Sequence, residues 1–550
     1  MPQDAYTLRH AAIELNEALA GGKINKIVQY GKEELAFLIY TGKRTLKLTV
    51  NVNASDCGVY FTEEEKEAPL VAPNFCMLLR KYLQGAEIKE VFLVGFERIL
   101  CFRLLCHADF SSAEQLFYVE VMGKYSNAVL VKDGIILGAL KTTALDENYK
   151  RTILAGVPYL LPAPQDKINP ADEAALRALC ECNQGSDLAQ FLFTRVAGLA
   201  PATARKIAET YTGGDLFSHV TQFIFNESPS PCVLEEDGKA IDFYAYSVSG
   251  ARPFETLLQA EAYFYRKKRE MRLLDGYRRK IETVLRAAVK KQEKQLCELL
   301  EKKRNAQNAE ENRVKGELLT ANLYAIPSGA AGCELYNYYD EAGGTIKIAL
   351  DRRLSPAENA QAYFKRYRKQ KRTLEAIAPR EKEVRAELYY LESVKGALSF
   401  ARTQDDYLAL LEELASEDLI KVQEKRKKER AIPWRTFEKD GFMIFAGRNN
   451  LQNDQLIRAS RPHDIWLHAQ KYHSAHVVIQ TEGRNVPSGV LQYAAEICAA
   501  YSSGAGGGKV PVDYTLLAHV KKPPKSKAGF VTYTDYQTIL VEPKALLQNK

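Results

Sequence analysis

Residues 355–358 read Ser-Pro-Ala-Glu and mark the start of a long helix in the middle of the chain. Serine at the N-cap, proline at the first helical position and glutamate three residues after the cap together indicate a capping box. Before it, residues 256–320 are rich in Lys, Glu, Gln and Arg, with apolar residues at three- and four-residue steps. Because only a small segment separates the two helices, we expect them to form a long antiparallel coiled-coil arm over 256–430.

The segment between the two helices, about 321–354, is predicted to be a small β insert. Strand-like runs lie at 336–339 and 345–350, with two glycines between them. Pro379 falls inside the second helix and predicts a kink or break there, because proline removes a backbone hydrogen-bond donor.

Units of mixed structure flank the arm. Residues 1–170 alternate short strands with two short helices, including a hairpin that turns at residues 41–43, which predicts a mixed α/β domain. Residues 171–255 are predicted to be helical. The turn at Gly198 fits either a plain loop or a helix-hairpin-helix whose backbone N–H groups could hold a phosphate. Residues 431–550 are again predicted to be α+β, with a strand-like run at 464–468 that contains Trp466. The sequence therefore predicts a multidomain α+β protein.

The composition limits the class of protein. Of 550 residues, 46% are hydrophobic and 26% are charged, which is typical of a folded chain with several domains. No apolar run of about 18 residues and no signal peptide is present, so we expect a cytoplasmic protein without membrane contact. The 10 cysteines are scattered, as in a reducing compartment. The two tight clusters, at 101–107 and 180–182, lack a second pair at zinc spacing, so no metal or cofactor is predicted.

Motifs for catalysis are missing from the sequence. The glycine-rich run at 504–509 is not a phosphate loop, because Ser503 stands where a glycine is needed and Val510 where Ser or Thr is needed. Four histidines between 463 and 476 leave metal ligation, hydrogen bonds in a polar turn and RNA contacts as alternatives. Without a nucleophile elbow, a zinc-protease helix or a kinase set, the sequence favours a binding protein over an enzyme.

Two stretches of the first domain suit contact with RNA. A Glu–Arg pair at 97–98 lies between apolar strand segments, where the arginine could present its fork to a phosphate or base edge while the glutamate orients it. The alternative is an exposed turn with a weak ion pair. The stretch 120–127 ends a strand and then places a cation, an aromatic ring and an amide together. The candidate residues are Glu97, Arg98, Glu120, Lys124, Tyr125 and Asn127.

Basic clusters recur at 265–269, 363–372, 424–430 and 521–527. A single run of charge is usually a solvated helix face. Four runs along an extended arm and its attached domain fit a protein that touches a large folded RNA at separated points. The candidate contacts are Arg366, Lys369, Lys427, Lys428, His468, His476, Lys521 and Lys522.

Short motifs over nearly the whole chain resemble the NFACT family, in particular its bacterial RqcH type, which is related to the eukaryotic NEMF proteins and often labelled as fibronectin-binding protein A homologues. The matching stretches are 74–81 (Asn-Phe-Cys-Met-Leu-Leu-Arg-Lys), 95–99, 120–127, 354–365, 464–469 (Asp-Ile-Trp-Leu-His-Ala) with 474–478, and 510–515 with 520–523.

The resemblance implies an N-terminal NFACT-N domain, a helix-hairpin-helix region, a coiled-coil arm with a middle insert and a C-terminal NFACT-R domain. It implies a role in ribosome-associated quality control. Family members bind a large ribosomal subunit that still carries peptidyl-tRNA, recruit tRNA, in bacteria chiefly alanine tRNA, and promote untemplated C-terminal alanine tailing of the stalled chain for degradation. A small Hsp15-like RNA-binding partner is also implied. Since the ribosome would form the peptide bond, the chain itself is not expected to be an enzyme.

The resemblance also assigns residues. Glu97 and Arg98 match an acidic–arginine pair needed for tRNA engagement, although the family usually has Asp in the first position, and Asp4 matches an acidic residue near the start. Two alternatives remain. One is a fibronectin-binding surface adhesin, as the family's older label suggests. The other is a DNA glycosylase-like enzyme, but the acidic residue that should follow Pro2 is Gln3 here.

Overall fold

The structure is a computed structural model that describes residues 3–64, 66–108, 111–143, 151–163, 165–183, 185, 187–236, 238–340, 344–421 and 432–543. The chain forms two compact units, Met1–Arg272 and Leu273–Lys550. The boundary falls inside helix α7 (Leu257–Ala306), whose first turns pack in the first unit.

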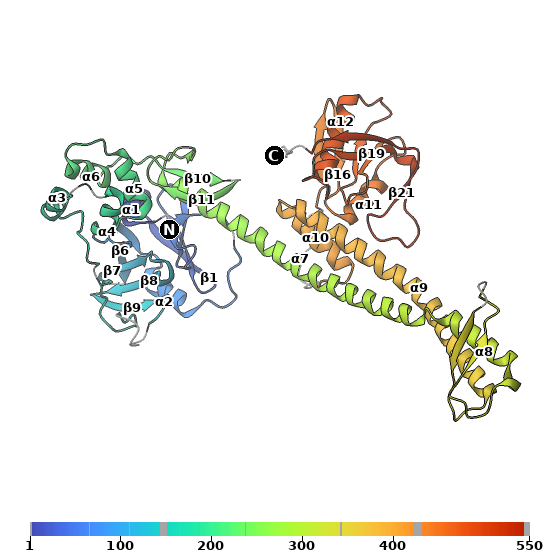
Figure 1. The fold of residues 1–550 in the computed structure, drawn as a ribbon. Helices are drawn as coiled ribbons and strands as arrows, with labels where there is room; N and C mark the ends of the chain where they lie inside the picture. Colours follow the sequence, from blue (N-terminus) through green and yellow to red (C-terminus); the bar gives the residue numbers. More distant parts are fainter. Residues whose placement is uncertain are drawn as a thin grey trace. The chain divides into compact units, whose positions relative to one another are not determined.

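The first unit is built on an antiparallel sheet of nine strands in the order β4-β3-β2-β1-β5-β6-β7-β8-β9. Helices α1 (Ala5–Leu19) and α2 (Asn74–Leu83) share one buried core with the strands, so both cover the same face (Figure 1). The hairpin predicted around residues 41–43 is confirmed, because β2 pairs with β3 across it. The strands are β1 (Lys23–Tyr30), β2 (Glu34–Tyr40), β3 (Thr45–Asn51), β4 (Gly58–Phe61), β5 (Glu87–Leu93), β6 (Ile99–Ala108), β7 (Ser111–Glu120), β8 (Asn127–Lys132) and β9 (Ile135–Ala139).

A helical layer follows the sheet, but it is shorter than the sequence predicted. Its helices are α3 (Glu173–Glu181), α4 (Leu188–Arg195), α5 (Pro201–Thr210) and α6 (Leu216–Ile224). The helical prediction for the rest of 171–255 is wrong. There, β10 (Cys232–Glu236), β11 (Lys239–Tyr244) and β12 (Arg252–Pro253) form a small sheet. Gly238, at φ +74°, supplies the positive φ between β10 and β11 that a tight hairpin needs.

Long helices run through the second unit. The helix predicted over 256–320 is interrupted, since α7 ends at Ala306 and α8 (Ala309–Ala321) begins after a turn that contains Asn308, a residue type with low helix propensity. Helix α9 (Pro356–Phe400) lies beside both (Figure 1). Lys303 of α7 donates to Glu381, while the later Asn312 donates to the earlier Gln370, so α9 runs antiparallel to α7 and α8. Packing of the coiled-coil type stays a prediction.

The capping box that starts α9 is confirmed. The hydroxyl of Ser355 accepts from the N–H of Glu358 at 3.3 Å, and the Glu358 carboxylate accepts from the N–H of Ser355 at 2.7 Å. Of the kink or break predicted at Pro379, the break is wrong, because α9 continues through it with Ile377 and Val384 buried on either side, and the kink stays a prediction. The β insert exists, but its first strand lies earlier than predicted. Its elements are η2 (Leu323–Ala325), β13 (Gly332–Tyr336) and β14 (Thr345–Ala349).

The C-terminal domain is α+β, as expected. Its antiparallel sheet has the order β15-β16-β18-β17-β19-β22. Helix α12 covers this sheet through an apolar core, and α10 connects α9 to the domain. The elements are α10 (Gln404–Ser416), β15 (Arg435–Lys439), β16 (Phe442–Ala446), α11 (Asn450–Ala459), β17 (Ile465–Ala469), β18 (Val477–Gln480), α12 (Ser488–Ala500), β19 (Val510–Leu516), η3 (Leu517–His519), β20 (Val520–Lys521), β21 (Thr532–Tyr533) and β22 (Gln537–Val541).

Candidate nucleic-acid interface

One carboxylate joins two helix N-termini in the first unit. Asp4 is the N-cap of α1, and its Oδ1 accepts a hydrogen bond from the N–H of Thr7 at 2.9 Å. Its Oδ2 accepts from the N–H of Ala200 at 2.9 Å and from the hydroxyl of Thr203 at 2.6 Å, at the start of α5. A capping carboxylate satisfies donors that a helix leaves unpaired and interacts favourably with the helix dipole. Asp4 therefore holds α5 against α1.

Gly198 seats the loop between β5 and β6 against these helices. Its φ is +76°, and a Cβ atom there would lie 2.5 Å from the Phe96 ring and 2.6 Å from the Cβ of Ala5. Only glycine fits this close approach. Phe96 is 4% exposed and belongs to the core that α1 and α5 share. The buried ring thus anchors the loop that carries Glu97 and Arg98.

The loop before β6 and the turn after β7 lie at the same end of these two neighbouring strands. This end of the sheet is called the edge below. Ile99 pairs with Glu120 in the β6–β7 ladder. One residue further out, the N–H of Val121 donates to the carbonyl of Arg98 at 2.9 Å. Both Arg98 and Glu97 are partly exposed. The fold therefore brings together two motifs that are separate in the sequence.

The turn after β7 exposes a cation beside an aromatic ring. Tyr125 is 60% exposed, and the Nζ of Lys124 lies 4.8 Å from the centre of its ring. Gly123, at φ +60°, starts the turn, and the hydroxyl of Ser126 closes it by accepting a backbone hydrogen bond at 2.8 Å. An exposed ring can stack on a nucleobase, while a lysine can contact a phosphate.

Other predicted contacts are buried. Glu120 is 2% exposed and accepts from Arg151 at 2.7 Å and from the hydroxyl of Tyr159 at 2.9 Å. Asn127 is 3% exposed and is bonded to both the N–H and the carbonyl of Lys141. Like Asp4, these side chains are committed to partners inside the unit. They fix the shape of the edge, whereas Lys124 and Tyr125 are exposed there.

Charge at the edge is predominantly positive. Burial raises the pKa of Glu97, while the charges of Arg98 and Lys167 oppose that rise. No motif in the sequence indicated Lys167, which lies in an irregular segment and donates to the carbonyl of Phe193 at 2.9 Å. Together with Lys124, these cations favour a polyanion over a neutral partner.

One of the two alternatives for the turn at Gly198 was a helix-hairpin-helix whose backbone N–H groups could hold a phosphate. In the structure, Ala200 donates its N–H to Asp4 instead, and Ala197 donates its N–H to the carbonyl of Ile168 at 2.8 Å. The carboxylate of Asp4 thus takes the position that a phosphate would have used. The assignment of this region as a helix-hairpin-helix stays a prediction.

Comparison with known proteins identifies the family of the chain. Residues 4–432 match the model of the NFACT N-terminal and middle domains. The chain belongs to the NFACT family. Residues 433–533 of this NFACT chain match the NFACT protein RNA binding domain.

Relatives share nearly the full length of the NFACT chain. The Rqc2 homolog RqcH of Bacillus subtilis is 32% identical, over 98% of this chain and 97% of its own length. The protein of the same name from Streptococcus pneumoniae serotype 2 is 32% identical, over 99% and 98%. A solved structure, the N-terminal part of the fibronectin/fibrinogen-binding protein from Streptococcus suis, is 27% identical with a TM-score of 0.43, and the match covers 48% of this chain and 98% of that one.

The ribosomal RNA contacts predicted for the NFACT chain lie in its second unit. Arg366 and Lys369 are exposed on α9, with the Arg366 guanidinium 5.1 Å from the centre of the Tyr363 ring. Lys427 and Lys428 lie outside the described residues. Lys521 is exposed, whereas Lys522 forms an ion pair with Asp454. His476 is 1% exposed and His468 is partly exposed, and both line a cavity between α9 and the C-terminal domain.

A groove lined by basic side chains of α7 and α9 lies in the second unit, and only some of these side chains belong to a cluster predicted from the sequence. The cluster at 363–372 supplies four of its cations. The other two lie outside the four predicted clusters: Arg380 follows further along α9, and Lys302 joins the groove through the pairing of α7 with α9. The cations that line the groove are Lys302, Lys365, Arg368, Lys369, Arg372 and Arg380.

The described part of the chain contains no group of three or more His, Cys, Asp or Glu side chains placed to hold a metal ion. None of the described helices combines the length and the apolar composition needed to span a bilayer.

Proposed function

We propose that this NFACT chain is a ribosome-associated quality control factor that binds large ribosomal subunits carrying peptidyl-tRNA. It recruits tRNA, in particular alanine tRNA, and so promotes untemplated alanine tailing of the stalled chain. Family membership and nearly full-length similarity to RqcH proteins support this role. The structural observation that carries it is the single edge of the first unit at which the Glu97–Arg98 loop is hydrogen-bonded to the segment that leads into the turn with Lys124 and Tyr125.

Chemistry at this edge would be positioning rather than catalysis. A phosphate can meet Arg98 or Lys124, and an unpaired base can stack on Tyr125. Holding tRNA beside the peptidyl-tRNA raises its effective concentration, and this can replace a large part of the entropic cost of a bimolecular step. In this proposal the peptide bond forms at the ribosome's own peptidyl transferase centre.

Recovery of tRNA with the purified chain tests the role of the edge. The Arg98→Ala variant should lose most co-purifying tRNA and keep its large subunits, because the groove on α9 is unchanged. Arg103→Ala is the matched control, since Arg103 lies on the same sheet, is 42% exposed and forms its ion pairs with the surface carboxylates Glu90 and Glu114. Equal tRNA recovery with wild type and Arg98→Ala would exclude this interface. Fibronectin binding, the alternative from the sequence, is tested by retention on immobilised fibronectin.

A further inference from the structure

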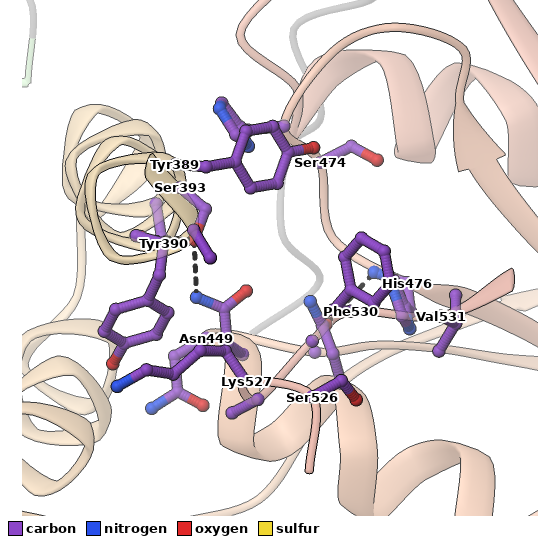
Figure 2. Close-up of a pocket in the computed structure, with 18 of the residues that line it drawn as sticks. Tyr389, Tyr390, Ser393, Asn449, Ser474, His476, Ser526, Lys527, Phe530 and Val531 are labelled. Carbon is purple, nitrogen blue, oxygen red and sulfur yellow. Dashed lines mark hydrogen bonds between the residues drawn. The ribbon is translucent and has the colours of Figure 1, made fainter. Parts of the chain in front are cut away.

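A cavity of about 1190 Å³ lies in the second unit, between α9 and the C-terminal domain. Figure 2 shows Tyr389 and Tyr390 from α9 on one side of it and His476, Phe530 and Val531 from the C-terminal domain on the other. The tRNA interface of the first unit contributes nothing to this cavity. A ligand in this cavity would therefore be bound by the second unit alone.

Positive charge dominates the rim. Seven Lys or Arg side chains line the cavity, against only two carboxylates, Glu383 and Glu387. Four of the seven are neutralised, because Lys527 pairs with Glu387, Arg380 with Glu383, and both Arg435 and Arg448 with Asp406. Within the described ranges, three exposed lysines on the rim have no charged partner. They are Lys382, Lys471 and Lys525. A rim of free cations is suited to a phosphate-bearing ligand.

Three exposed aromatic rings line the same cavity. Tyr389 is 55% exposed, Tyr472 is 39% exposed and Phe530 is 46% exposed. Large apolar side chains that remain exposed around a cavity mark a binding site more often than a structural core. Rings next to unpaired cations are the combination that single-stranded nucleic acid uses, with the base on the ring and the phosphate on the lysine.

Neutral polar groups lie deeper in the cavity. Burial lowers the pKa of His468 to about 4 and also lowers the pKa of His476, so both rings are uncharged at neutral pH. The Nδ1 atom of His476 is buried and has no hydrogen-bond partner among the described residues. A buried polar atom without a partner is costly unless a ligand satisfies it. A nucleobase edge offers donors and acceptors of the kind an imidazole nitrogen needs.

The basic groove leads to this cavity along α9. Arg380 lines both the groove and the cavity. The other cations of the groove precede it on α9 or lie on α7, and among the described residues that line the groove none is acidic. A phosphate backbone that follows the groove would therefore arrive at the rim of the cavity.

We propose that this cavity binds one unpaired nucleotide of an RNA strand, with its base among Tyr389, Tyr472 and Phe530 and its backbone continuing into the basic groove of α9. The site goes beyond the tRNA interface and does not depend on it. A double-stranded RNA would fit the groove but could not place a base in the cavity without unpairing it.

Base-dependent binding by the full chain tests this site. The probes are a fluorescent single-stranded RNA of about ten nucleotides and an abasic strand of the same length. In Phe530→Ala, affinity for the base-containing RNA should fall about fivefold to a hundredfold, the usual range for one stacked base, while affinity for the abasic strand stays within about twofold. Phe530→Tyr keeps a ring and should bind as wild type does. Equal losses for both strands, or no loss for either, would overturn the proposal.

Cross-linking locates the base directly. A single-stranded RNA that contains 4-thiouridine should give adducts on Tyr389, Tyr472 or Phe530, and Lys509→Glu, an exposed charge change away from the cavity, should leave them unchanged. Adducts found only outside the cavity would overturn the proposal. Arg98→Ala should lose tRNA but keep these adducts, so failure of one site is distinguishable from failure of the other.

Discussion

The hydroxyl of Thr203 donates a hydrogen bond of 2.6 Å to the carboxylate of Asp4, and this contact ties the start of α5 to the start of α1. The same carboxylate caps α1 through Thr7. With Gly198 closing on Phe96, this junction sets the position of the Glu97–Arg98 loop. The conformation of the edge that would bind tRNA therefore depends on these buried contacts.

Removing the double cap should loosen the first unit. Asp4→Ala should lower its free energy of unfolding by about 2 to 4 kcal/mol, because two helices lose a cap and buried donors lose their partner. Hydrogen exchange of residues 201–210, followed by mass spectrometry, should speed up by the corresponding factor. Asp187→Ala removes a cap from α4 alone and should cost about 1 kcal/mol. Equal effects of the two variants would contradict the bridging role of Asp4.

Tyr125 should contribute to tRNA affinity without contributing to stability. Because the ring is 60% exposed, Tyr125→Ala should change the free energy of unfolding by less than about 0.5 kcal/mol. Its affinity for tRNA should fall by about 1 to 3 kcal/mol, the usual loss for one stacked base. Tyr125→Phe keeps the ring and should bind normally. Filter binding with purified tRNA measures these differences, and a loss shared by both variants would argue against stacking.

A buried ion pair should make the C-terminal domain sensitive to acid. Asp406 faces Arg435 at 2.7 Å and also pairs with Arg448. Burial alone would raise the pKa of Asp406, but the charge of Arg435, two backbone N–H groups and Arg448 outweigh it and lower the pKa to about 2. The unfolded value lies near 3.8. The stabilisation is therefore complete above about pH 4 and is lost as the pH falls towards 2, with a size of roughly 2 kcal/mol.

Tryptophan fluorescence can follow the unfolding of the C-terminal domain separately from the rest of the chain. Both tryptophans of the chain, Trp434 and Trp466, lie in the C-terminal domain. Denaturation followed by their emission should show the loss between pH 4 and 2 in wild type and its absence in Asp406→Asn, which should also be destabilised by about 3 to 5 kcal/mol at pH 7. Asp405→Asn alters a neighbouring carboxylate that is 48% exposed and should behave as wild type does. An acid transition unchanged in Asp406→Asn would rule out this pair as its cause.

The groove on α9 should anchor RNA through phosphates. Replacing Lys365, Lys369 and Arg372 with glutamine should weaken binding to large subunits and flatten the salt dependence by about 0.7 to 0.9 per lost phosphate contact. A matched triple change of Lys290, Lys291 and Lys294, exposed on α7 outside the groove, removes the same charge. Sedimentation over a range of salt concentrations compares the two. Equal slopes for the two variants would mean that only net charge matters.

Local signals in the sequence predicted local structure well. The capping box at Ser355, the hairpin near 41–43 and the strand that contains Trp466 depend on neighbouring residues, and all three were found. Predictions failed where distant contacts decide. Packing around Pro379 keeps α9 continuous, and the last part of 171–255 forms a small sheet in which β10 pairs with both β11 and β12, where helix was predicted. Except for Lys167, the exposed and partly exposed members of the candidate interface were named from the sequence, but their common edge depends on the β6–β7 pairing.

A reconstituted tailing reaction tests the proposed function most directly. It contains the purified chain, large ribosomal subunits with peptidyl-tRNA and charged alanine tRNA, and mass spectrometry reads the length of the nascent chain. We predict alanine additions that require the subunits, stop with an inhibitor of peptidyl transfer and fail with Arg98→Ala. Additions without ribosomal subunits, or with Arg98→Ala at the wild-type rate, would contradict the claim that this chain positions tRNA for a reaction catalysed by the ribosome.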